Sequence, residues 1–181
     1  KYRGNMKQED EFLDALYKED DVGCVIYTHI HVENLIISYV TTLLKQPEHL
    51  KSMRLDYLQK VHLALSLGLP DYFKAPLLNL GKIRNNFAHR LDQGIDSNLV
   101  NNFFKSFSNF HKNEIVSQST RTVFSSSSNW GSLPVKEQFI SCCNLLHTKL
   151  SCVIIEHDTE KSIDEMARTI LELEINTQKY L

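Results

Sequence analysis

The chain has 181 residues, of which 42% are hydrophobic and 23% are charged, and this length and composition suit one globular domain with a core of its own. Its 20 Lys and Arg residues and 22 Asp and Glu residues give a formal net charge of −2. This charge excludes an overall positive field that would draw the protein onto a nucleic-acid backbone. Only 6 Gly and 4 Pro residues interrupt the chain, which favours helices.

Hydrophobic spacing predicts two helices in the first quarter of the chain. Residues 1–7 are polar and are expected to form a flexible leader outside a single domain that spans residues 8–181. A short amphipathic helix is predicted at 9–18. A long helix is predicted at 22–45, where apolar residues occur on more than one side of the helix. We expect this long helix to form the centre of a bundle.

The next stretch contains two further helical patterns separated by turn residues. Apolar residues recur at helical spacing across 50–67, between Pro47 and Gly68. Pro70 then precedes a helix that we expect to run to about residue 91. Pro76 lies near its start and predicts a kink or a division there, because proline lacks an amide donor and crowds the preceding turn.

The last part of the chain predicts three helices and one irregular segment. Asp96 is placed to cap a short helix that carries several phenylalanines. Residues 113–133 are rich in serine and predict a surface loop or insertion within the domain. Two final helices are predicted at 134–154 and at about 162–174. No strand alternation is evident, so the predicted fold is an all-α single helical bundle with a long central helix.

Neither a cofactor nor a metal site is predicted. The four cysteines show no Cys-x-x-Cys spacing, and reduced thiols in a cytoplasmic protein are the simpler interpretation. His29 and His31 project to different sides of a helix, which argues against a metal pair, and Glu33 is better explained as a hydrogen-bond partner. No apolar run approaches the roughly 20 residues that span a bilayer, so no membrane partner is expected.

The most informative segment is a polar cluster in an apolar helical context. Leu80, Ile83 and Phe87 belong to an apolar stripe, so the intervening polar side chains lie on another face of the same helix. A helix needs no such cluster for packing. The polar residues of the segment that could meet a partner or a ligand are Lys82, Arg84, Asn85, His89 and Arg90.

Helix geometry separates two members of this cluster. At about 100° per residue, Arg84 and His89 lie roughly 140° apart, whereas Asn85 and His89 share a face. Arg84 and His89 would converge if the arginine reached around, if the helix ended near His89, or if two copies met in a dimer. The structural alternative is that His89 is a helix-end residue and Arg84 forms a surface ion pair.

The functional alternative is ribonucleolytic. His89 would serve as a general acid or base and Arg84 would stabilise a pentacovalent phosphate, with Asn85 orienting the histidine or the phosphate. This chemistry suits attack by an RNA 2′-hydroxyl without a metal. The segment Arg84-Asn85-Asn86-Phe87-Ala88-His89 resembles the motif of the HEPN superfamily, helical bundles that dimerise and include metal-independent endoribonucleases and toxins.

A broader resemblance extends over roughly residues 20–107. The runs Asp21-Val22-Gly23-Cys24-Val25, Glu33-Asn34-Leu35-Ile36 and Lys82 to His89, with the 54–69 helix, resemble the bacterial mannitol-operon repressor family. That family implies an all-helical regulator without a helix-turn-helix, acting through a protein partner. By this resemblance Asp21, Glu33, Lys82 and Arg90 are candidate binding residues beside Arg84, Asn85 and His89.

These two resemblances define the expected functions. The leading expectation is a cytoplasmic regulatory protein of the repressor type that forms a homodimer and binds a protein partner. The alternative is an endoribonuclease or toxin, for which the partners would be RNA and an antitoxin. A shared fold does not decide between them.

Overall fold

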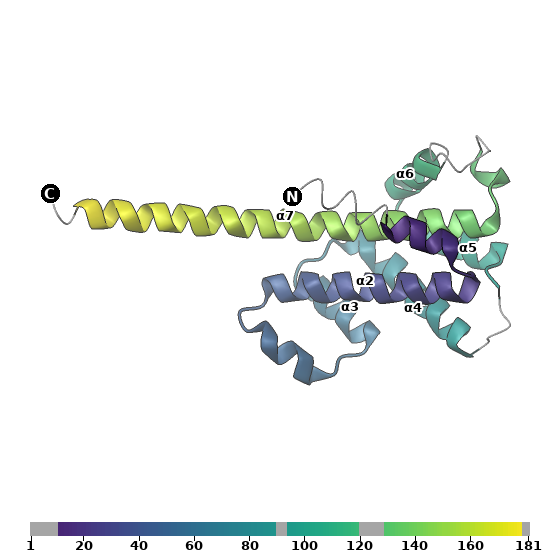
Figure 1. Ribbon diagram of the computed structural model, residues 1–181, viewed down its shortest axis with the longest axis horizontal. Helices are drawn as coiled ribbons and strands as arrows, with labels where there is room; N and C mark the ends of the chain where they lie inside the picture. The colour runs from purple at the N-terminus through teal and green to yellow at the C-terminus, as the bar shows by residue number, and fades with distance from the viewer. Residues whose placement is uncertain (1–10, 90–93, 120–128, 179–181) are drawn as a thin grey trace.

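The structure, a computed structural model, describes residues 11–89, 94–119 and 129–178, with side chains as far as residue 170. Throughout these ranges the regular structure is helical, as Figure 1 shows, so the predicted all-α bundle is confirmed. The expected leader at 1–7 lies outside the described residues. The N-terminal helical residues, 11–18, bury Phe12 and Leu16 against the bundle.

Helix α2 (Asp21–Leu43) is the central helix, as predicted. It packs against α3 (Tyr57–Ser66), α4 (Lys74–His89) and α7 (Val135–Gln178), which explains why its apolar residues are not confined to one side. The Asp20 carboxylate caps its first turn by accepting a hydrogen bond from the Gly23 amide at 2.6 Å. Its fully buried apolar side chains are Cys24, Val25, Val32, Ile36 and Tyr39.

The prediction of one helix over 50–67 is wrong. The chain forms a 3-10 segment, η1 (Pro47–Met53), and then turns at Arg54, whose φ of 49° lies in the left-handed region. Helix α3 begins only after Asp56, which forms a capping box with Gln59. Apolar spacing alone does not detect this interruption, because Leu55 and Leu58 continue the periodic pattern across it.

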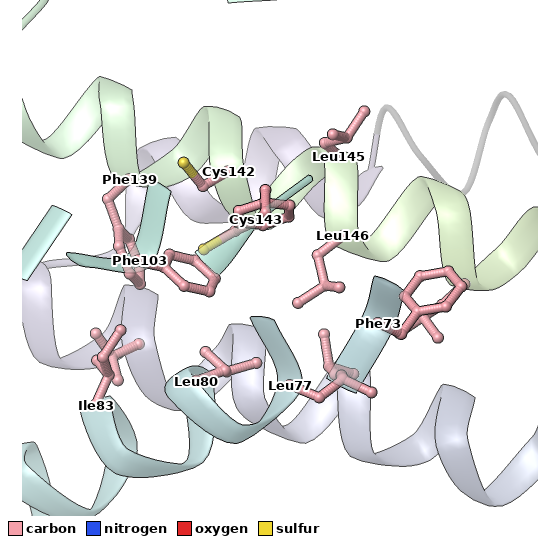
Figure 2. Close-up of a cluster of buried hydrophobic side chains, with 14 of the residues drawn as sticks. Phe73, Leu77, Leu80, Ile83, Phe103, Phe139, Cys142, Cys143, Leu145 and Leu146 are labelled. Atoms are coloured by element: carbon pink, nitrogen blue, oxygen red, sulfur yellow. The ribbon is translucent and has the colours of Figure 1, made fainter. Parts of the chain in front are cut away.

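Helix α4 is a single α-helix, preceded by the short 3-10 segment η2 (Asp71–Phe73). Pro76 lies in the first turn of α4, where backbone amides have no partner within the helix. Proline therefore costs no hydrogen bond there, and the helix is not divided. Buried Leu77, Leu80, Ile83 and Phe87 form the predicted apolar stripe. Figure 2 shows three of these residues facing side chains of α7.

The expected loop at 113–133 is only partly correct. Its first residues belong to α6 (Asn109–Ser119), which follows α5 (Ser97–Ser106). The polar composition of α6 does not indicate a helix in the sequence. The helix is held against α7 by the fully buried Ile115 and by Glu114, whose Oε1 accepts a hydrogen bond from Lys149 Nζ at 2.7 Å. Residues 120–128 lie outside the described part, and a short 3-10 segment, η3 (Trp130–Ser132), leads into α7.

Helix α7 replaces the two helices predicted at its position. It runs without a break from Val135 to Gln178, 44 residues, which corresponds to a length of about 66 Å. One 18-residue window reaches a mean hydropathy of 1.3, a value also found in membrane-spanning helices, and 44% of it is buried within the protein. Figure 2 shows its Phe139, Cys143 and Leu146 within the hydrophobic core. Its C-terminal half extends beyond the other helices (Figure 1).

Candidate functional site

The polar cluster of α4 borders a groove between α2, α3 and α4. The groove has a volume of about 600 Å³. Lys82, Arg84 and Asn85 line it from α4, while Leu58 and Leu78 give it apolar walls. His29 and Glu33 of α2, Asp56 and Tyr57 at the start of α3, and Gly81 complete the lining. The groove therefore combines cationic, anionic and apolar groups on one surface.

A close contact between α3 and α4 shapes this groove. The Tyr57 hydroxyl donates a hydrogen bond to the Leu77 carbonyl at 2.9 Å. Its ring lies over Gly81, where a Cβ atom would come within 2.8 Å of Tyr57 Cε1. Gly81 thus permits the aromatic ring to approach the backbone of α4. Burial raises the pKa of Tyr57, so its hydroxyl remains protonated and keeps donating.

An ion pair and a neutral histidine lie together on the α2 side of the groove. Glu33 Oε1 accepts a hydrogen bond from Lys60 Nζ at 2.7 Å, and Glu33 Oε2 lies 3.8 Å from His29 Nδ1. Burial lowers the pKa of His29. The charge of Glu33 opposes this shift, whereas the charges of Arg84 and Lys60 add to it. His29, only 7% exposed, is therefore neutral at pH 7. The predicted role of Glu33 as a hydrogen-bond partner is confirmed.

The α4 side of the groove presents cationic groups to solvent. Lys82, Arg84 and Asn85 are exposed, and Arg84 Nη1 donates a hydrogen bond to Asn85 Oδ1 at 3.3 Å. Arg84 appears in none of the ion pairs found among the described residues, so the surface ion pair considered for it is not formed there. Its guanidinium retains donors that an incoming carboxylate or phosphate can accept.

The structure does not bring all the predicted site residues together. His89 is exposed and is the last residue of α4, outside the groove that Arg84 and Asn85 line. This agrees with the helical angle between Arg84 and His89. Arg90 lies outside the described residues. The grouping of these side chains in one site is therefore limited to Lys82, Arg84, Asn85 and Glu33.

Asp21, the remaining candidate, has a structural contact elsewhere. Its Oδ2 accepts a hydrogen bond from the Ile95 amide at 2.9 Å, in the segment that precedes α5. A Cβ atom at Gly94 would lie 3.2 Å from the same oxygen. Asp21 thus joins the start of α2 to the chain before α5, and it does not line the groove. Its assignment as a binding residue does not match this position.

Sequence reasoning missed the residues of α2 and α3 that complete the groove. Tertiary packing brings His29 and Tyr57 into the groove that Arg84 lines, and it brings Lys60 to Glu33. The sequence gives no local signal for this packing. The aromatic contact between His29 and Tyr57, with ring centroids 4.3 Å apart, is an example. In the described part of the chain, no three His, Cys, Asp or Glu side chains cluster as a metal ion requires.

Comparisons with known proteins give no family for the chain. No protein-family model matches it, and no significant match is found among curated proteins or among solved structures. The resemblance to the mannitol-operon repressors therefore rests on the sequence runs quoted above. The groove and the exposed face of α4 are the features of the structure that bear on function.

Proposed function

We propose that this protein is a cytoplasmic regulatory protein of the mannitol-operon repressor type that binds a protein partner through the groove between α2, α3 and α4. One observation carries the proposal: Arg84 and Asn85 line this groove, whereas His89 does not. A binding surface needs cationic donors beside apolar walls, and this groove has both. A catalytic pair would need the arginine and the histidine at the same reacting group.

The chemistry of the groove favours an acidic partner segment with an apolar anchor. The exposed Lys82 and Arg84 offer donors for carboxylates. Leu58, 51% exposed, and Leu78 offer apolar surface nearby. Glu33 is already paired with Lys60, so it does not neutralise the two cations of α4. No base-reading helix-turn-helix is required by this mode of action.

Quantitative partner capture from the producing cells tests the proposal. The wild type, Arg84→Ala and Lys74→Ala would be compared as baits, because Lys74 is an exposed cation of the same helix outside the groove. We expect Arg84→Ala to lose the specific partner at least tenfold and Lys74→Ala to retain it. Equal recovery by all three baits would contradict the proposed surface.

A metal-independent endoribonuclease is the second candidate. The observation that favours it is that Arg84, Asn85 and His89 are all exposed on α4. In a dimer, His89 of a second copy can approach Arg84 of the first, although the two residues of one chain do not share the groove. Incubation with single-stranded and structured RNA in chelator, beside His89→Ala and Arg84→Ala, tests this function. Cleavage that leaves a cyclic phosphate and is lost in both variants supports the nuclease. Intact RNA with all three proteins rejects it.

A further inference from the structure

The C-terminal part of α7 leaves the bundle as a solitary helix. Every side chain from Asp158 to Ile170 is exposed, and Figure 1 shows this part of α7 extending away from the other helices. A helix gains most of its stability in water from packing of an amphipathic face. This segment has no such packing within its own chain among the described residues.

A regular apolar stripe runs along the solitary segment. Ile163, Met166 and Ile170 are 56%, 59% and 56% exposed. Their spacing of three and then four residues places them on one face, as at positions a, d and a of a coiled coil. Single exposed apolar residues are common, but this spacing is the one with which helices contact each other in coiled coils.

The stripe lies on the side of α7 that is turned away from the end of α2. On the other side of α7, Lys161, Asp164 and Arg168 line a hollow together with Thr42 and Leu43 at the end of α2. The stripe residues take no part in that hollow. Because about 100° separates successive residues, the stripe points to the side of α7 remote from α2.

The side chains that border the stripe favour a second copy of the chain as its occupant. Ser162, Ala167 and Thr169 are small and uncharged, so two such helices can approach without repulsion between like charges. Glu160, the charged residue nearest this border, lines the hollow beside Thr42 and Leu43 of α2. Acidic Asp164 and basic Arg168 lie four residues apart on the back of the helix, where they compensate each other.

We propose that two copies of this chain associate through a parallel, two-stranded coiled coil formed by the C-terminal part of α7. Isoleucine at both a positions is typical of parallel two-stranded coiled coils, in which position d is commonly leucine and is Met166 in this chain. The groove is lined by residues of α2, α3 and α4. These helices lie in the bundle, away from the projecting part of α7 (Figure 1), so this dimer leaves both grooves accessible. The inference does not depend on the proposed function.

Sedimentation equilibrium of the purified full chain tests the dimer. We expect the wild type to show twice the chain mass of 21.0 kDa. Met166→Glu would place two carboxylates against each other and weaken the dimer at least a hundredfold. Arg168→Ala, on the back of the helix, should leave it unchanged. Since these side chains lie outside the core, thermal denaturation should show that the bundle is folded in all three proteins. A monomeric wild type, or an undiminished Met166→Glu dimer, would overturn the proposal.

Cross-linking tests the parallel arrangement. In a Cys152→Ser background, Ile170→Cys would place the two new thiols opposite each other at position a only when the helices are parallel. We expect a covalent dimer after mild oxidation. A dimer that persists by sedimentation without forming this disulfide would contradict the parallel pairing.

Discussion

At the residue scale, the shape of the groove depends on the absence of a side chain at Gly81. An added methyl group would meet the Tyr57 ring at 2.8 Å and force it off the backbone of α4. Tyr57 would then lose its hydrogen bond to the Leu77 carbonyl. The site thus rests on a residue that carries no chemistry of its own.

We predict that Gly81→Ala lowers the free energy of unfolding by about 1–2 kcal/mol, although alanine is the better helix former. Urea denaturation measures the change. The control is Gly81→Ala combined with Tyr57→Ala, which removes the clashing ring. In the double variant the alanine at 81 should be neutral or stabilising relative to Tyr57→Ala alone. If the losses of unfolding free energy for Gly81→Ala and Tyr57→Ala simply add in the double variant, contact with the ring is not the cause of the destabilisation.

The buried His147 predicts a loss of stability in acid. Its ring stacks on Phe12 with centroids 4.0 Å apart, and its Nδ1 is buried without a hydrogen-bond partner. Burial and, to a smaller extent, the charge of nearby His31 lower the pKa of His147 to about 4. The unfolded chain, with a pKa near 6.5, therefore takes up the proton first as pH falls.

The stabilising contribution of neutral His147 is complete above about pH 6.5 and disappears as the pH approaches 4. The expected loss from this group is up to about 3 kcal/mol. Urea denaturation at pH 7 and at pH 4.5 of the wild type and of His147→Phe measures it, since phenylalanine keeps the ring but does not titrate. The variant should lose less stability over this interval. An equal loss in both proteins would remove His147 as a cause.

At the scale of elements, sequence periodicity located the helices better than it located their ends. It placed α2 and the apolar stripe of α4 correctly, because both have long patterns with buried faces. It joined η1 to α3 because it does not detect the left-handed turn at Arg54. It divided α7 because polar residues near 158–161 resemble a loop, although an exposed helix accepts them equally well.

The site was predictable only where its residues share one helix. Arg84 and Asn85 were found from their positions on α4, and the separation of Arg84 from His89 followed from the helical angle. Glu33 was assigned a hydrogen-bond role but not its partner Lys60, which lies 27 positions away. His29 and Tyr57 enter the groove through the packing of α2 and α3 on α4. Local pattern carries no information about such contacts.

The capping residues offer a direct test at this scale. Asp96 Oδ1 accepts a hydrogen bond from the Leu99 amide at 2.7 Å and begins α5. We predict that Asp96→Ala lowers the free energy of unfolding by about 1 kcal/mol, whereas Asp96→Asn, which also caps well, changes it by a few tenths at most. Thermal denaturation of the three proteins compares them. Equal losses of stability for Asp96→Ala and Asp96→Asn would mean that the negative charge of Asp96, rather than its capping hydrogen bond, stabilises α5.

At the scale of the whole molecule, the structure separates two surfaces. The groove between α2, α3 and α4 carries exposed cations beside apolar walls. The projecting end of α7 carries an exposed apolar stripe formed by Ile163, Met166 and Ile170. We assign partner binding to the first surface and self-association to the second. A variant in one surface should therefore leave the function of the other unchanged.

Quantitative capture with the wild type and Arg84→Ala under identical conditions is the sharpest test of whether a partner binds at the Arg84 surface. We expect recovery of a specific partner to be similar with the wild type and Lys74→Ala and to fall at least tenfold with Arg84→Ala, while the sedimentation mass stays that of a dimer. Full recovery of that partner by a folded Arg84→Ala protein would show that the partner binds elsewhere.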